Sequence, residues 1–145
     1  MPTLARRTCW LIVAALACLA AAPALAQGVE LPLQKAVIQV SDNDPQKWNL
    51  ALNNARNVLD ELGGETVRLE IVVYGPGIGM LKADSPVAKR VADALRSGVK
   101  VVACENTMRA QKLSVPDMLP DIGYVGAGVV ELMKRQQQGW AYIRP

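Results

Sequence analysis

The chain has 145 residues, of which 16 are Lys or Arg, 13 are Asp or Glu, three are Cys and none is His. Without histidine there is no Ser-His-Asp or Cys-His nucleophile pair and no ordinary zinc site, so we expect neither a hydrolase nor a metalloenzyme. No bound cofactor is expected either. The net charge of +3, with only three Trp and three Tyr, does not predict an electrostatic and stacking surface for nucleic acid, which is not an expected partner.

The N-terminal segment has the pattern of a signal peptide. Arg6 and Arg7 precede an apolar run that ends at Ala22, which is too short to span a membrane but has the length of a signal-peptide core. The small residues Ala24-Leu25-Ala26 follow at the positions that a signal peptidase recognises. We therefore expect cleavage after Ala26, a periplasmic or secreted protein, and no stable membrane span once the signal is removed.

Two other export signals match the same segment more weakly. Ala15-Leu16-Ala17-Cys18 resembles a lipoprotein cleavage box but lacks the usual leucine three residues before the cysteine. The Arg6-Arg7 pair resembles a twin-arginine signal without most of its surrounding consensus. The choice between general secretion and twin-arginine export stays open at this point.

Cleavage would change the cysteine content and define one domain. Residues 1–26 are the predicted signal peptide and residues 27–145 a single domain, since about 120 residues support one hydrophobic core and no linker divides them. Cys9 and Cys18 would leave with the signal, so no intrachain disulfide is possible and the net charge falls to about +1. The remaining Cys104 is then a buried small hydrophobe, an intermolecular bridge or a reactive thiol.

The domain begins with a strand followed by a helix. Ala36 to Val40 is a short, largely β-branched run, and Asp44-Pro45 combines an N-cap carboxylate with a proline at the first helical position. Apolar residues then recur at three- and four-residue steps, which predicts one buried helical stripe of Trp48, Ala51, Leu52, Ala55, Val58, Leu59 and Leu62. Gly63-Gly64 supplies the C-terminal stop.

The same alternation continues along the chain. Val67 to Tyr74 reads as a strand, and Ser85-Pro86 opens a helix that carries Val87, Val91, Ala94 and Leu95 and ends at Gly98. The remaining predicted elements are a strand at Val99 to Ala103, a helix at Asn106 to Lys112, a strand at Ile122 to Val125, a helix at Val129 to Gln138 and a strand at Trp140 to Ile143. We interpret Lys134-Arg135, together with Gln136 to Gln138, as a solvated helix face, with a subunit contact as the less favoured alternative.

This pattern predicts the fold class and the edge at which a site lies. Strands separated by helical crossovers pair in parallel with right-handed connections, so we expect an α/β three-layer sandwich around a mostly parallel sheet of about five strands. Ligands of such sheets bind at the carboxyl ends of the strands, near a switch in strand order. Four segments reach that edge: Asp42-Asn43-Asp44, Gly75 to Gly79, Cys104 to Thr107, and Gly126 to Gly128.

Cys104 is the candidate catalytic residue. It follows a buried strand and precedes a helix start at which Asn106 or Thr107 is available as cap, so the free amides of that helix can stabilise a thiolate. Glu105 disfavours a second negative charge, whereas Arg109, one turn later, is placed to neutralise Glu105. A reactive thiol, which we expect to be partly exposed, and a buried inert cysteine carry equal weight from position alone.

The glycine segments are weaker candidates for a pocket. Gly75, Gly77 and Gly79 lack the spacing of a dinucleotide-binding motif, so a glycine-permitted turn is favoured over a phosphate cradle. Gly126 and Gly128 can bring backbone amides to a ligand, but close packing of a strand and a helix explains them equally well.

Several stretches together resemble the DsrE/DsrF-like family of sulfur-relay proteins. They are Val102 to Met108, Asp117 to Pro120, Ala127 to Leu132, Arg135-Gln136 and Gly139 to Pro145. The segment around Cys104 and the C-terminal stretch resemble the branch of intracellular sulfur oxidation proteins. The resemblance implies a flavodoxin-like fold, a homo-oligomer such as a trimer or hexamer, donor and acceptor proteins for sulfur, and a persulfide carried on Cys104. It also implies that Gly75 to Gly79 helps to wall the pocket. Asn43, in the segment that follows the first strand, is a further candidate pocket residue because of its place at the sheet edge.

We therefore expect an exported sulfur carrier, at most a sulfurtransferase-like enzyme. The export signal departs from the intracellular setting of the named relay proteins, so the donor and acceptor are not carried over. Two alternatives stay open: an oligomeric small-ligand-binding module in which Cys104 is structural, and a thiol redox sensor. Accessibility of Cys104 distinguishes the thiol roles from the structural one.

Overall fold

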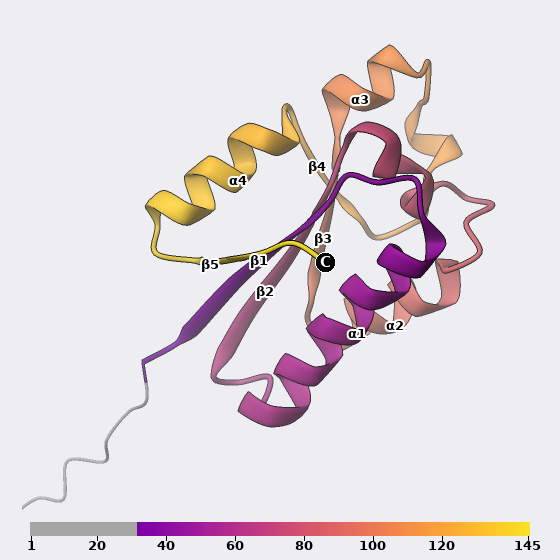
Figure 1. Cartoon of the computed structure of the whole chain (residues 1–145). Helices are drawn as coiled ribbons and strands as arrows, with labels where there is room; N and C mark the ends of the chain where they lie inside the picture. Colours follow the sequence, from indigo (N-terminus) through magenta and orange to yellow (C-terminus); the bar gives the residue numbers. More distant parts are fainter. Residues whose placement is uncertain (1–31) are drawn as a thin grey trace, which may run out of the picture. The chain divides into compact units, whose positions relative to one another are not determined.

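The computed structural model describes residues 32–145, and the predicted signal peptide and its cleavage site lie outside them. Five strands form one sheet in the order β4-β3-β2-β1-β5, and every neighbouring pair is parallel. The strands are β1 (Gln34–Val40), β2 (Val67–Val73), β3 (Lys100–Cys104), β4 (Gly123–Val125) and β5 (Ala141–Ile143). The predicted α/β three-layer sandwich with a five-stranded parallel sheet is confirmed (Figure 1).

Four α-helices and two short 3₁₀ segments connect the strands. The helices are α1 (Pro45–Leu62), α2 (Ala88–Arg96), α3 (Glu105–Ala110) and α4 (Gly128–Gln137), and the 3₁₀ segments are η1 (Gly75–Leu81) and η2 (Val115–Asp117). Among the described helices, none combines the length and the hydropathy that crossing a membrane requires.

Helix α1 begins and ends where the local sequence signals place it. The Asp44 carboxylate accepts a hydrogen bond of 2.8 Å from the Gln46 amide, and Gly63 takes a φ of +81°, which favours glycine. Trp48, Ala51, Leu52 and Ala55 are buried, but Leu62 is 47% exposed, which corrects the predicted stripe at its last position. The reason is length, since an 18-residue helix spans about 27 Å and the seven-residue strand β1 only about 23 Å.

Two other predictions differ from the structure. Helix α2 begins at Ala88 rather than at Ser85-Pro86, because the Ala88 amide first closes a turn onto the Ser85 carbonyl (3.1 Å) and helical bonding starts with Val91 onto Val87. The glycine-rich segment after β2 is a 3₁₀ segment that runs to Leu81, longer than the expected turn. The Gly77 amide bonds the carbonyls of Ser41 (3.0 Å) and Tyr74 (3.2 Å) there.

The handedness of the crossovers distributes the helices over the two faces of the sheet. The chain moves from β1 through β2 and β3 to β4 in one direction, and right-handed connections then place their helices on one face. Residues of α1, α2 and α3 pack in the main core with Ile38, Ile71 and Val101. The connection from β4 to β5 runs in the opposite direction, so α4 lies on the other face (Figure 1), where Leu132 packs on Val37, Val72 and Val102.

Candidate functional site

Cys104 lies at the switch point of the sheet. It is the last residue of β3 and pairs in register with Val125, the last residue of β4. The chain leaving β3 passes to the α1 and α2 face through α3, whose Met108 belongs to that core, whereas the chain leaving β4 enters α4 on the opposite face. In parallel sheets, the carboxyl ends of two such strands form the crevice in which ligands bind.

The thiol is covered by the bend between β4 and α4. The Cys104 sulfur lies 3.9 Å from the Gly126 carbonyl oxygen, and the Asn106 amide donates to the same oxygen at 3.1 Å. Cys104 is only 4% exposed, so the expectation of a partly exposed thiol is wrong for this conformation of the chain. The cover is thin, because Gly126 itself is exposed and a Cβ built on it would meet no atom within 4 Å.

The surroundings of the sulfur favour its thiolate. Burial raises the pKa of Cys104, but hydrogen bonds from the Thr107 hydroxyl and from the backbone amides of Gly128, Thr107 and Asn106 outweigh it, so the pKa lies below the ordinary cysteine value. The donors come from both elements that flank the switch point, the first turn of α3 and the start of α4. This arrangement gives an acidic but sheltered thiol.

Thr107 connects the thiol to the glycine-rich segment. The Gly75 amide donates a hydrogen bond of 2.9 Å to the Thr107 side-chain oxygen. Since that oxygen accepts from Gly75, its own proton is free to point to Cys104. Gly75 takes a φ of +55°, and the Gln111 side chain donates to its carbonyl at 3.4 Å. The turn after β2 therefore orients the hydroxyl that stabilises the thiolate.

Tyr74 is a residue at this site that sequence reasoning missed. The β2 and β3 register pairs Val73 with Ala103, so the next position along places Tyr74 beside Cys104. Tyr74 also supports α4, because a Cβ on Gly128 would lie 2.8 Å from the Tyr74 Cβ. Burial raises the pKa of Tyr74, against a hydrogen bond from Ser41 and the charge of Arg144. The aromatic residue after a β-branched run was the only signal, and strand packing explains it equally well.

Of the other predicted site residues, Gly77, Gly79 and Asn43 form one group and Glu105 and Arg109 another. Gly77 and Gly79 are required for close packing, since a Cβ on Gly77 would meet the Val40 carbonyl oxygen at 2.7 Å and one on Gly79 would meet the Trp48 ring at 3.2 Å and the Asn43 side-chain oxygen at 3.4 Å. Neither glycine nor Asn43 contacts the sulfur through any described hydrogen bond.

Glu105 and Arg109 do not form the predicted ion pair. Both are exposed, and the Arg109 guanidinium donates instead to the side-chain oxygen of Asn106. The electrostatic balance expected between Glu105 and Arg109 is therefore replaced by a contact between Arg109, in the last turn of α3, and Asn106 in the first. Asn106 thus serves the site twice, through its amide toward the Gly126 carbonyl and the sulfur, and through its side chain as an anchor for Arg109.

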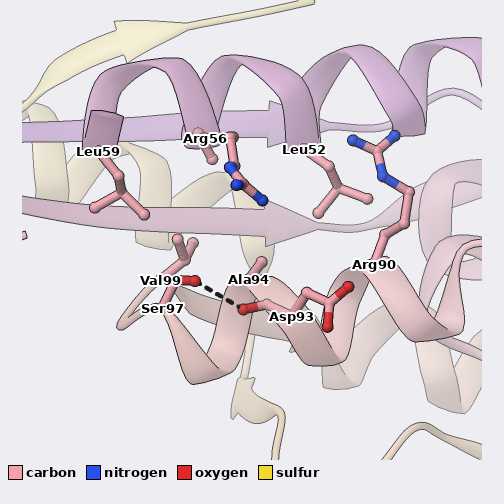
Figure 2. Close-up of a pocket in the computed structure, with 9 residues that line it drawn as sticks. Leu52, Arg56, Leu59, Arg90, Asp93, Ala94, Ser97 and Val99 are labelled. Atoms are coloured by element: carbon pink, nitrogen blue, oxygen red, sulfur yellow. Dashed lines mark hydrogen bonds between the residues drawn. The ribbon is translucent and has the colours of Figure 1, made fainter. Parts of the chain in front are cut away.

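Two hollows of the described chain lie away from Cys104. One, of about 70 Å³, is lined by residues of α1 and α2 together with Ser97 and Val99, and Figure 2 shows Arg56, Arg90 and Asp93 beside the apolar side chains of Leu52 and Leu59. Its charged groups are already engaged: Arg90 bonds Asn49 and Asn53, and Asp93 pairs with Arg96. The other, of about 190 Å³, lies between α2 and Leu119 to Asp121. Within residues 32–145, no three carboxylates or thiols are grouped as metal ligands.

Comparison with known proteins places these features in a family context. A family model, the DsrE/DsrF-like family, matches residues 34–145. A protein of unknown function from Methanobacterium thermoautotrophicum, MTH1491, is 36% identical, with a TM-score of 0.73 over 77% of this chain and 99% of that one. The fold is also similar to BT1422 from Bacteroides thetaiotaomicron (15% identical, TM-score 0.64, 77% and 95% covered) and to ychN from E. coli (15%, 0.61, 77% and 99%). No curated protein sequence matches this chain.

Proposed function

Because the chain belongs to the DsrE/DsrF-like family, we propose that it is a sulfur carrier that holds sulfane sulfur as a persulfide on Cys104. The observation that carries this proposal is the convergence of one hydroxyl and three backbone amides on the sulfur, which lowers the pKa of the thiol in spite of its burial. The thiolate is the nucleophile in sulfur transfer, and this chemistry needs neither histidine nor metal.

The proposed transfer has two steps that mirror each other. The Cys104 thiolate attacks the outer sulfur of a persulfide donor, the sulfur–sulfur bond of the donor breaks, and its electron pair leaves on the donor thiolate. The product is a Cys104 persulfide. A thiolate of the acceptor then attacks the outer sulfur of that persulfide and releases the Cys104 thiolate. No net oxidation occurs, because a sulfur–sulfur bond forms as another breaks.

Because the Cys104 thiol is buried, the donor and the acceptor need a route to its sulfur atom. A second sulfur atom on Cys104 needs the space now taken by the bend at Gly126, whose carbonyl lies 3.9 Å from the sulfur. Gly126 is exposed and has no side chain, so an outward displacement of its peptide group breaks the hydrogen bond from the Asn106 backbone amide but moves no side chain of that residue. We propose that donor and acceptor reach the sulfur from this side.

The test is the intact mass of the full chain after incubation with inorganic polysulfide. We expect the unmodified chain to gain one sulfur atom more than Cys104→Ser, which keeps Cys9 and Cys18, and we expect this difference to disappear after addition of a thiol acceptor. Gly126→Pro, which stiffens the cover, is expected to slow the loading. A chain that never gains sulfur while native, but does so after denaturation, would assign Cys104 to the structural role, which its 4% exposure favours.

We also propose that copies of the chain associate through the outer face of α4. Val129, Val130 and Met133 are 54%, 42% and 53% exposed and lie at helical spacing on one side of the helix. Since α4 is the helix that covers its face of the sheet, these apolar side chains have no described partner. An exposed apolar stripe of this kind is typical of a protein interface.

We also propose that the protein is exported and cleaved after Ala26. This proposal rests on the sequence pattern alone.

A further inference from the structure

Helix α4 contacts the sheet through a stripe of three residues with different chemistry. Gly128, Leu132 and Arg135 follow one another at steps of four and three, so they share one face of the helix. Gly128 lies against Tyr74 at the thiol end, and Leu132 packs in the small core of this face. Arg135 reaches down to Glu70 at the far end of the helix. Apolar packing supports the middle of α4, and a charge supports its end.

Glu70 is a fully buried acid in a strand of otherwise apolar buried residues. It is 0% exposed, and one of its oxygens lies 2.6 Å from the Arg135 guanidinium and 3.5 Å from the Lys100 ammonium group. Arg135 also pairs with Glu131 at 2.8 Å and stacks on Trp140, 4.7 Å from the ring centroid. Neither Glu70 oxygen has a hydrogen-bond partner among the described residues. The contact is therefore a close ion pair with poor hydrogen-bond angles.

The Glu70–Arg135 ion pair is better explained by a role in positioning α4 than by a contribution to the free energy of unfolding. Burial raises the pKa of Glu70 in spite of Lys100 and Arg135, so the loss of hydration exceeds the attraction of the two cations. A well-packed apolar pair at these positions often gives equal or greater stability. A charge in this place does, however, discriminate between positions of α4 along the sheet.

A shift of α4 by one turn shows this discrimination. A turn is about 5.4 Å, and a slip in one direction would bring Glu131 over Glu70, which opposes two carboxylates. A slip in the other direction would bring Gln138 there and leave the buried acid with the more distant Lys100 ammonium group, 3.5 Å away, in place of the Arg135 contact at 2.6 Å. Leucine in the middle of the stripe does not resist either slip as strongly, since apolar contacts are non-directional.

We infer that the Glu70–Arg135 ion pair sets the position of α4 along the sheet and thereby holds the start of the helix at Gly128, about 10 Å away along the helix, beside the bend whose Gly126 carbonyl lies 3.9 Å from the Cys104 sulfur. Glu70 and Arg135 are then positioning residues for the thiol, on the opposite end of α4 from the site they serve. The inference rests on the proposed thiol function and specifies how the fold maintains it.

The test compares the ionisation of the thiol in the full chain and in Glu70→Gln and Arg135→Gln. Thiolate absorbance against pH is recorded for each protein and for its partner carrying Cys104→Ser, so that tyrosine and the other cysteines are subtracted. We expect the Cys104 midpoint to rise by about half to one pH unit in each single variant, a roughly three- to tenfold smaller thiolate fraction below the midpoint. The Cys104 midpoint of the double variant should be no higher than that of the single variants, because the two residues act as one pair.

Two control variants separate position from general weakening of the fold. Leu52→Ala removes core packing on the opposite face of the sheet, and Arg96→Gln removes an exposed ion pair. Neither should move the Cys104 midpoint. An unchanged midpoint in both Glu70→Gln and Arg135→Gln, or a similar rise in Leu52→Ala, would overturn the positioning role. A thiol that already titrates at the ordinary cysteine value in the unmodified protein would instead contradict the proposed function.

Discussion

Gly128 and Tyr74 are in direct contact across the sheet face: a Cβ on Gly128 would lie 2.8 Å from the Tyr74 Cβ and 3.0 Å from its ring. The contact brings the first amide of α4 down to the strand ends, where it donates to the sulfur of Cys104. Only glycine permits this approach at a helix start. The same backbone atom therefore serves packing and the electrostatics of the thiol.

A pair of glycine substitutions tests this contact. Gly128→Ala should lower the free energy of unfolding by about 1–3 kcal/mol, because the methyl group overlaps the Tyr74 side chain. Gly126→Ala, two residues earlier, should stay within about 1 kcal/mol of the unmodified protein, since its Cβ points into open space. Urea denaturation of the two variants measures the difference. Equal stabilities would argue that α4 moves freely away from Tyr74.

The Thr107 hydroxyl should control the acidity of the thiol. Thr107→Val keeps the shape of the side chain but removes both the acceptor of the Gly75 amide and the donor to Cys104. We expect the titration midpoint of the Cys104 thiol to rise. We also expect the free energy of unfolding to fall by about 1–3 kcal/mol, because the Gly75 amide is left without its acceptor. Thr107→Ser, which keeps the hydroxyl, is the control and should retain the low midpoint. Identical titrations of the Val and Ser variants would rule out this role.

Glu70 should make the stability of the fold depend on pH. Its pKa is raised in the folded chain by burial, so its contribution is fully present below the pKa of an unperturbed glutamate, about 4.3, and is lost as the pH rises through the folded value. Glu70→Gln removes this loss. The difference in unfolding free energy, variant minus unmodified protein, should therefore increase with pH from about 4.3 upward, as measured by urea denaturation at several pH values. Asp60→Asn, which changes an exposed carboxylate, should show no such increase.

A charged substitution on the apolar outer face of α4 should weaken the association between copies of the chain. A charge at Val130 or Met133, as in Val130→Asp or Met133→Asp, should reduce the mass measured by light scattering, because a carboxylate in an apolar interface is desolvated without a partner. Leu50→Asp is the control on α1, where the leucine is 45% exposed. A protein that is already monomeric at micromolar concentration would contradict the proposed association.

The predicted export signal is tested by N-terminal sequencing of the protein recovered from the cell envelope or medium. Cleavage after Ala26 gives a chain that begins at Gln27. A lipidated Cys18 at the terminus would indicate the lipoprotein box instead. Retention of Met1 would contradict export.

Individual helices and strands could be predicted from the sequence because they depend on residues close together in the chain. The Asp44 cap, Pro45 and the stripe from Trp48 to Ala55 lie within one helix, and the helix that they predict is the one observed. The strands followed from runs of β-branched residues, and their parallel pairing followed from the helices between them. The errors at Ser85-Pro86 and Leu62 concern where an element begins or how far the sheet extends, which depends on neighbours distant in the chain.

The sequence by itself determined the element order, the parallel sheet and the position of Cys104 at a strand end, because side-chain periodicity and chain connectivity decide these. Only the tertiary structure decided that β4 lies beside β3, which makes Cys104 the switch point, and that a bend at Gly126 covers the thiol. It also reversed the interpretation of Arg135, which turns inward to Glu70 rather than to solvent. Strand order, burial and ion pairing arise from contacts between residues far apart in the chain, and a single sequence carries no local pattern for them.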